Sequence, residues 1–332
     1  MSRCLGRSAV EITRLGFGGA PLGNLFSVVS ERAAEEALET AWDAGWRYFD
    51  TAPLYGHGLG EQRIGRFLRG KPRNAYRLST KIGRLLVPQS GKVDGGAYVE
   101  VPNAVPVYDY SRDGALRSVE ESLARLGLDR IDILLIHDID RFTHKEDQPR
   151  RFREAMDGAY PALADLRARG VVGAIGLGVN DWRVCEDFAR IADVDCFLLA
   201  GRYTLLEQEP LTSLFPLCIG KNISVIAGGV FNSGILATGP RPGAFYNYHP
   251  APPAILERAT RLDHICQAHG VALAAAALQF PLAHPAVAGA VVGARKGEEV
   301  RSGQALLDRA IPAAFWTDLK AQRLIAADAP TP

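Results

Sequence analysis

The feature of this sequence that most constrains its fold is a strand-like segment followed by a helical one, repeated eight times. The strand-like segments are short apolar runs at 15–19, 46–50, 76–80, 131–136, 172–177, 195–199, 223–227 and 286–292. The segments with helical spacing lie at 31–44, 60–68, 111–126, 154–169, 181–191, 209–220, 255–269 and 298–307. Alternation of this kind is typical of a parallel sheet. Eight units in 332 residues predict an α/β fold, a closed (β/α)8 TIM barrel that forms a single domain over residues 1–332.

An open, doubly wound sheet is the main alternative fold. Such a sheet carries Gly-x-Gly-x-x-Gly directly after a strand, with an acidic residue about twenty positions later. This chain has no such fingerprint, so we expect the barrel.

Three connections are much longer than the few residues usual between such segments. They span 84–110, 138–153 and 228–253, and the first and last are rich in Gly, Pro and Tyr. Long loops at the carboxyl-end rim of a barrel are usually lids or specificity loops, although insertions without a function are an alternative. We expect residues 3–13 to form a small hairpin that closes the opposite end.

Charge and cysteine content exclude several classes of function. The 38 basic and 37 acidic residues give a formal net charge of +1 without a dominant basic run, so we expect no binding to nucleic acid or to a membrane surface. The five cysteines are scattered and odd in number, which predicts reduced thiols, and no cluster has metal-ligand spacing. The start of the chain lacks a secretory signal, and the longest apolar stretch, 271–280, is too short to span a bilayer. We therefore expect a soluble, cytoplasmic protein without a metal.

Four polar side chains stand at or just after the ends of three successive predicted strands: Asp50, Tyr55, Lys81 and His137. Each alone could serve the fold only, as a turn cap, a surface hydroxyl, a solvated strand end or a satisfied edge histidine. In a parallel barrel, however, all four converge on the carboxyl-end rim, where the active sites of such barrels lie. A carboxylate, a phenol, an ammonium and an imidazole together predict proton-transfer chemistry.

These residues and their surroundings resemble the aldo-keto reductases. The resemblance rests on Asp-Thr-Ala-x-x-Tyr-Gly at 50–56, Lys81, His137, the glycine-rich strand that ends at Asn180, and Gly-Ala-Arg-Lys at 293–296. They follow the order and spacing of that family along nearly the whole chain. Two longer motifs resemble those of one branch of the family, whose members oxidise aldoses and pyridoxal. They are Phe-Asp-Thr-Ala-Pro-Leu-Tyr-Gly at 49–56 and Leu-Ile-His-Asp-Ile-Asp at 135–140.

The resemblance implies a role for each of the four. Tyr55 would transfer the proton, Lys81 would activate it, Asp50 would hold Lys81, and His137 would orient the substrate oxygen, so that Tyr55 and His137 contact the substrate. A free tyrosine has a pKa near about 10. Because an adjacent ammonium favours the phenolate, we expect Lys81 to lower the pKa of Tyr55 toward the working range.

The resemblance also implies a nicotinamide cofactor extended across the rim. Asn180 would hold the carboxamide, a segment at 231–234 the pyrophosphate, and residues near 293–304 the adenosine end. The full set of expected cofactor contacts is Gly19, Asp50, Asn180, Phe231, Asn232, Ser233, Gly234, Gly293, Arg295 and Gln304.

The chain departs from the common family pattern at several of these contacts. Val179 precedes Asn180 where a serine is usual, Ala200 stands where many members have glutamine, and Gly228 stands where a tyrosine usually stacks. Val300 occupies the place of an arginine found in NADP-preferring members, which favours NAD. The nearby cations Arg295, Lys296 and Arg301 leave NADP as the alternative.

The resemblance and the polar, aromatic rim loops predict an NAD-linked dehydrogenase acting on a small molecule. We expect it to oxidise the C1 hydroxyl of a ring-form aldose, of the L-fucose or D-threo-aldose type, to the lactone. The nearest alternative is oxidation of pyridoxal or reduction of simple aldehydes and ketones. An alternative of another class is a non-catalytic redox sensor that binds the cofactor. The sequence leaves the oligomeric state open.

Overall fold

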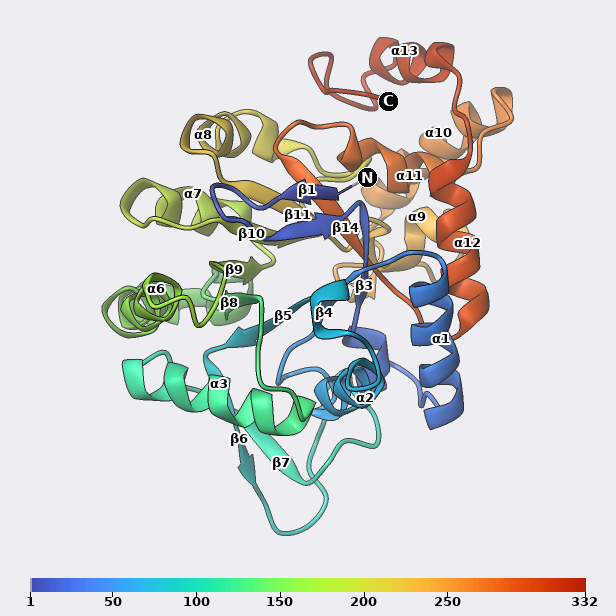
Figure 1. Cartoon of the computed structure of the whole chain (residues 1–332). Coiled ribbons are helices and arrows are strands. Elements are labelled where there is room, and N and C mark those ends of the chain that lie inside the picture. The colour runs from blue at the N-terminus through green and yellow to red at the C-terminus, as the bar shows by residue number, and fades with distance from the viewer. Residues whose placement is uncertain (1) are drawn as a thin grey trace.

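Eight parallel strands close into a barrel in the computed structural model, which describes residues 2–332 (Figure 1). In chain order they are β3 (Leu15–Gly18), β4 (Tyr48–Asp50), β5 (Arg77–Ile82), β8 (Ile133–His137), β9 (Ala174–Val179), β10 (Cys196–Ala200), β11 (Ser224–Gly228) and β14 (Val287–Gly293). Each strand pairs in parallel with the next one in this order, and β14 closes the ring on β3. The predicted barrel is confirmed.

A helix lies between each barrel strand and the next, and these helices cover the outside of the barrel. These helices are α1 (Glu31–Asp43), α2 (Leu59–Leu68), α3 (Arg112–Leu126), α6 (Tyr160–Ala168), α7 (Trp182–Ile191), α8 (Leu214–Lys221) and α11 (Leu273–Leu282), with α12 (Gly297–Asp308) after the last strand. Ser30 and Ser111 cap the starts of α1 and α3, since each side chain accepts a hydrogen bond from a backbone N–H of the first turn. In Figure 1, α6, α7 and α8 line one side of the barrel, and α1, α11 and α12 line the other.

The helix that leads into the last barrel strand differs from the prediction. We expected 255–269 in that place, but α11 contacts β14 and α12, whereas α10 (Pro253–Ala268) packs outside against α13 (Ala313–Ala321). Nearly every side chain of α11 is buried, so its sequence is apolar on all faces and shows no helical period. No single helix within residues 2–332 is long and apolar enough to cross a membrane; α10 and α11 pass that test only as a pair bent by 102°.

A hairpin closes the barrel at the end where its strands begin, as predicted. β1 (Ser2–Cys4) pairs antiparallel with β2 (Glu11–Thr13). Its apolar residues Leu5, Val10 and Ile12 are buried in one cluster with inward-facing residues of six barrel strands. The core of the barrel is therefore sealed from below by the first segment of the chain.

The three long connections carry structure of their own. The first holds a hairpin of β6 (Arg84–Pro88) and β7 (Ala104–Tyr108), which projects from the barrel in Figure 1. The second holds α4 (Arg141–His144) and α5 (Gln148–Glu154), followed by a π-helical turn at Ala155–Ala159. The third holds α9 (Ile235–Thr238) and a hairpin of β12 (Phe245–Tyr246) and β13 (His249–Pro250). Short 3₁₀ turns lie at Ala20–Gly23, Arg73–Ala75, Lys145–Asp147, Glu209–Leu211 and Asn232–Gly234.

Candidate active site

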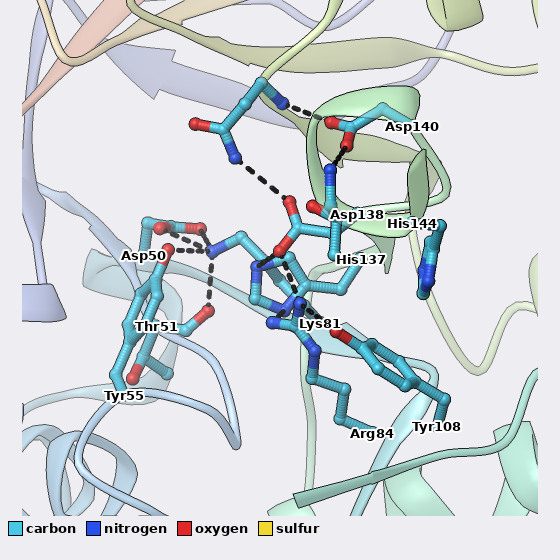
Figure 2. A network of polar contacts seen from close by, with 12 residues as sticks. Asp50, Thr51, Tyr55, Lys81, Arg84, Tyr108, His137, Asp138, Asp140 and His144 are labelled. Carbon is cyan, nitrogen blue, oxygen red and sulfur yellow. Dashed lines mark hydrogen bonds and ion pairs between the residues drawn. The ribbon is translucent and has the colours of Figure 1, made fainter. Parts of the chain in front are cut away.

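Three neighbouring barrel strands bring the four predicted strand-end residues together at the rim (Figure 2). Asp50 and His137 are the last residues of β4 and β8, and Lys81 lies one residue before the end of β5, between them. Tyr55 comes from the connection between β4 and α2. We call Asp50, Tyr55, Lys81 and His137 the tetrad.

Lys81 is the centre of the tetrad. Its ammonium is buried and donates to both oxygens of Asp50, at 3.1 and 2.8 Å, to the carbonyl oxygen of Thr51 at 2.9 Å, and to the hydroxyl oxygen of Tyr55 at 2.9 Å. Ser79 donates a further hydrogen bond of 2.6 Å to Asp50. A buried ion pair is stable only when its remaining donors and acceptors are satisfied, and these contacts satisfy them.

A glycine turn brings Tyr55 back over Lys81. Gly56 has a φ of +64°, and a Cβ atom there would lie 2.3 Å from the carbonyl oxygen of Gly23, so only glycine fits. The turn places the Tyr55 ring with its centroid 4.5 Å from Lys81 Nζ. The glycine that follows Tyr55 in the motif at 50–56 therefore allows the turn that holds Tyr55 over Lys81.

The pKa of Tyr55 departs from the prediction. We expected Lys81 to lower it, but burial of the phenol, followed by the negative charge of Asp50, raises it well above its usual value. Asp50 lies against the same ammonium and opposes its effect on the phenol, so desolvation dominates. In the free enzyme Tyr55 is therefore held as a phenol.

His137 lies edge-on to Tyr55, with ring centroids 6.0 Å apart and an interplanar angle of 86°. Burial, followed by the positive charges of Arg84 and Lys81, holds the pKa of His137 well below its usual value. The imidazole is therefore neutral at physiological pH. Its backbone carbonyl accepts a hydrogen bond of 2.7 Å from Tyr110 Oη, which fixes the end of β8.

A second buried ion pair, Arg84 with Asp138, faces the tetrad and was not among the predicted site residues (Figure 2). Arg84 Nη2 lies 2.7 Å from Asp138 Oδ2, and both side chains are almost fully buried. Burial disfavours the charged guanidinium, but Asp138 outweighs it and the pKa of Arg84 is raised; burial also raises the pKa of Asp138 against the opposing effect of Arg84. Asp138 directly follows the last residue of β8, whereas Arg84 lies in one of the long, loop-like connections, so the sequence did not link the two.

Two of the long connections supply aromatic side chains around Tyr55. The ring of Tyr98 lies 6.3 Å from that of Tyr55, between centroids. Tyr248 has a φ of +66°, and its backbone N–H donates to Ser233 Oγ at 3.0 Å. Phe26, from the connection after β3, packs against Phe245 with ring centroids 6.5 Å apart. The mouth of the site thus has aromatic walls.

Most of the predicted cofactor residues lie along one side of the rim beside the tetrad. They follow the ends of β9, β11, β14 and β3, and in the barrel order only β10 interrupts this series before β4. Asn180 donates from Nδ2 to Asp138 Oδ1 at 3.2 Å, and Arg295 donates to Ser27 Oγ at 3.3 Å. Most of the set is therefore brought together at one edge.

The segment at 231–234 offers a buried acceptor to a cofactor. Asn232 is buried, and its Oδ1 has no hydrogen-bond partner within the described chain. The backbone N–H groups of Asn232 and Gly234 already donate to the carbonyl oxygens of Gly229 and Phe231, so the carboxamide oxygen of Asn232 is a group left open to a ligand. A nicotinamide dinucleotide would supply the donor that this oxygen lacks.

Three residues that the sequence linked to cofactor binding serve the packing of the barrel. Gln304 lies two turns into α12, where its side chain bonds Trp46 Nε1 at 2.9 Å and Asp308 at 2.8 Å, so it is not brought to the rim. A Cβ at Gly19 would lie 2.7 Å from the carbonyl oxygen of Asp50, so packing alone requires that glycine. Val300 is fully buried in the core, so its side chain is not exposed at the rim.

The chain matches the aldo/keto reductase family model over residues 14–322. It is 43% identical to the pyridoxal 4-dehydrogenase of Microbacterium luteolum, with 97% of each chain covered. It is 41% identical to the D-threo-aldose 1-dehydrogenase of a Pseudomonas species, with 98% of this chain and 97% of that one covered. Among solved structures, the holo form of an aldo-keto reductase from Bacillus halodurans superposes with a TM-score of 0.76 at 25% identity, covering 99% and 97% of the two chains.

These matches extend over almost the whole chain, and they agree with the geometry of the tetrad on the barrel rim. They also set aside the non-catalytic sensor, because the relatives are dehydrogenases by name. The chain belongs to the aldo-keto reductase family and is an oxidoreductase.

Proposed function

We propose that this enzyme oxidises the hydroxyl group of a cyclic hemiacetal to the lactone, with NAD as the hydride acceptor, and that a ring-form aldose oxidised at C1 is its substrate. The observation that carries the proposal is Tyr55 Oη at 2.9 Å from the buried Lys81 Nζ, beside a neutral His137 at the rim. The two relatives support the choice of substrate. An aldose at C1 and pyridoxal at position 4 each carry an aldehyde carbon that closes on a hydroxyl of the same molecule.

The tetrad performs the proton transfer in this proposal. In the phenolate form Tyr55 takes the proton of the hemiacetal hydroxyl, while the carbon–hydrogen bond of the same carbon breaks and a carbonyl forms. Lys81, fixed by Asp50, stabilises the phenolate. Neutral His137 donates a hydrogen bond to the substrate oxygen and holds it next to Tyr55. When bound, NAD supplies the hydride acceptor and so takes up the two electrons.

The charges around the tetrad favour an uncharged substrate. Lys81 is paired with Asp50, and Arg84 is paired with Asp138, so the two buried cations near the reacting centre are both neutralised. Neither of these two cations is free to pair with a phosphate or carboxylate on the substrate. The guanidinium and the carboxylate still offer hydrogen bonds, which suits the neutral hydroxyl groups of a sugar.

The charges at the start of α12 favour NAD over NADP. Each cation in this region has an acidic neighbour: Arg295 Nη2 lies 3.6 Å from Glu299, Lys296 Nζ lies 2.7 Å from Glu298, and Arg301 Nη2 lies 4.0 Å from Glu36. In this proposal the adenosine end of the cofactor lies here, next to Arg295. A 2′-phosphate would have to compete with these carboxylates for the cations.

Pyridoxal is the second candidate substrate, and the aromatic walls of the mouth favour it. Tyr98 lies beside Tyr55 with 6.3 Å between ring centroids, and a flat pyridine ring can stack on such a surface. The 43% identity to a pyridoxal 4-dehydrogenase gives it further support. Both candidates share the chemistry at the hemiacetal carbon.

The test is a substrate panel with product identification. Reduced nicotinamide is followed by absorbance with NAD and NADP in parallel, against L-fucose, L-galactose, D-arabinose, pyridoxal and simple primary alcohols. We expect NAD-dependent oxidation of one sugar group, with the lactone detected by mass spectrometry before it hydrolyses. Activity on pyridoxal alone would replace the aldose with the second candidate. Activity on simple alcohols but on no hemiacetal would contradict the proposal.

A further inference from the structure

The guanidinium of Arg84 lies against the histidine of the tetrad. Its Nη1 is 3.4 Å from His137 Nδ1, in a contact that is buried, and its Nη2 is 2.7 Å from Asp138 Oδ2. Arg84 is the first residue of β6, in the long connection after β5. The same guanidinium therefore touches both the imidazole and the carboxylate beside it.

An arginine can only donate hydrogen bonds. His137 Nδ1 must therefore be the unprotonated, accepting nitrogen, and the single proton of the neutral ring must be on Nε2. Nε2 lies 3.4 Å from Asp138 Oδ2 without the alignment of a hydrogen bond, whereas the equally long contact between Arg84 Nη1 and Nδ1 has that alignment. The Nε2 proton thus remains available to a substrate oxygen.

We propose that Arg84 is a positioning residue, which fixes the Nε2–H tautomer of His137 and keeps the ring neutral by facing Nδ1 and by neutralising Asp138. This inference rests on the proposed role of His137 in the reaction. Arg84 itself acts through His137 and transfers no proton.

Charged groups of both signs surround the His137 imidazole. Lys81 faces it from β5 and Arg84 from β6, Asp138 follows it on the chain, and the Tyr55 ring lies edge-on. Tyr110 Oη contacts the backbone carbonyl of His137 and not its ring, and it also bonds the carbonyl oxygen of Asp138 and His144 Nε2. Without Arg84, the carboxylate of Asp138 would be the nearest charge to Nε2 and would favour the imidazolium.

The test is NMR of the free protein labelled with ¹⁵N in histidine, with the His137 signals assigned by their loss in His137→Gln. In the unaltered enzyme we expect the Nε2–H tautomer and a titration midpoint well below that of a free histidine. In Arg84→Met we expect its titration midpoint to rise by at least about one pH unit. The matched control is Tyr108→Phe, which removes a hydroxyl 3.5 Å from Arg84 Nη2 but leaves the guanidinium, and should leave the titration unchanged.

A double variant keeps the test decisive if Arg84→Met folds poorly. Replacing both members of a buried ion pair is usually tolerated better than removing one, and Asn is among the residues that adopt the positive φ of 48° found at Asp138. In Arg84→Met/Asp138→Asn we expect a neutral His137 again, but with a mixture of the two tautomers, because nothing donates to Nδ1.

Kinetics give a second readout on whichever substrate is turned over. In Arg84→Met the ratio of kcat/KM for oxidation at pH 6 to that at pH 8 should fall about tenfold below the ratio of the unaltered enzyme. An Nδ1–H tautomer in the unaltered enzyme, or an unchanged His137 titration in Arg84→Met, would overturn the inference. Since the NMR result needs no substrate, failure of this inference is distinct from failure of the proposed function.

Discussion

The Asp50–Lys81 pair shows how one residue changes the effect of another. Lys81 alone would be expected to stabilise the Tyr55 phenolate, but Asp50 lies 2.8 Å from the same ammonium. Burial of the phenol, and then the charge of Asp50, raises the pKa of Tyr55, and the pairing explains why Lys81 does not lower it. The free enzyme therefore presents an acid, and the base needed for oxidation forms only as the pH rises.

The pH dependence of the two directions should differ for this reason. A raised pKa lowers the phenolate fraction at any given pH, so kcat/KM for oxidation should rise about tenfold per pH unit and keep rising to at least about pH 9. Carbonyl reduction uses the phenol, which is present up to that pH. Its kcat/KM should therefore stay nearly constant, which makes it an internal control for the oxidation profile. An oxidation profile that levels off near neutral pH would contradict this assignment.

At the scale of elements, glycines set how closely the outer helices approach one another. In α2, a Cβ at Gly65 would lie only 2.0 Å from the carbonyl oxygen of Leu126, at the end of α3. In α12, the nearest atom to a Cβ at Gly303 is a ring carbon of Trp46 at 3.5 Å. The first glycine is required by backbone contact, and the second is not.

Alanine at these two positions should therefore have opposite effects. Gly65→Ala should lower the free energy of unfolding by roughly 1–3 kcal/mol, because α2 must move away from α3. Gly303→Ala should raise it by about 0.5–1 kcal/mol, because alanine is the better helix former and meets no clash. Chemical denaturation of both variants checks this, and a stabilising Gly65→Ala would show that the two helices are not in backbone contact.

The start of α12 should control the choice of cofactor. Glu299 accepts a hydrogen bond of 2.7 Å from the backbone N–H of Arg295 and lies 3.6 Å from its guanidinium. Glu299→Gln should raise kcat/KM with NADP relative to NAD by about threefold or more, because the cation becomes available to a phosphate. Glu35→Gln, on the face of α1 toward Arg63 and Arg66, is the control. An unchanged cofactor ratio in Glu299→Gln would place the adenosine end elsewhere.

At the scale of the whole molecule, the two ends of the barrel have separate tasks. The rim carries the tetrad and the long connections, whereas the N-terminal hairpin seals the other end with Leu5, Val10 and Ile12. In barrels of this kind the rim is the functional face and the opposite face mainly provides stability. Substitutions at the hairpin end of the barrel should therefore alter stability and leave catalysis intact.

Ile12 offers a direct check of that separation. It is 1% exposed, so Ile12→Ala should lower the free energy of unfolding by about 2–5 kcal/mol, with kcat unchanged for the folded enzyme. Cys4→Ala, at an exposed position of the same hairpin, should change stability by less than about 0.5 kcal/mol. A loss of kcat in folded Ile12→Ala would show that the two ends are coupled.

The sequence predicted the barrel and the convergence of the tetrad because both follow from local patterns. Strand and helix periods identify the units, and parallel closure brings strand ends to one rim. The pattern could not reveal the Arg84–Asp138 pair, because β6 was hidden in a loop-like segment rich in Gly and Pro. It also misjudged the environment of Tyr55, since a pKa depends on all neighbours in space and on burial. The helix α11 was not predicted because it is buried on nearly all sides and its sequence therefore shows no helical period.

The most direct test of this mechanism is Tyr55→Phe, measured both for turnover and for binding of reduced nicotinamide by fluorescence. The matched control is Tyr76→Phe, which removes a buried hydroxyl that has no hydrogen-bond partner within the described chain. We expect Tyr55→Phe to lose at least about a hundredfold in kcat, with cofactor affinity nearly unchanged, and Tyr76→Phe to keep both. Substantial turnover in Tyr55→Phe would contradict the assignment of proton transfer to this phenol.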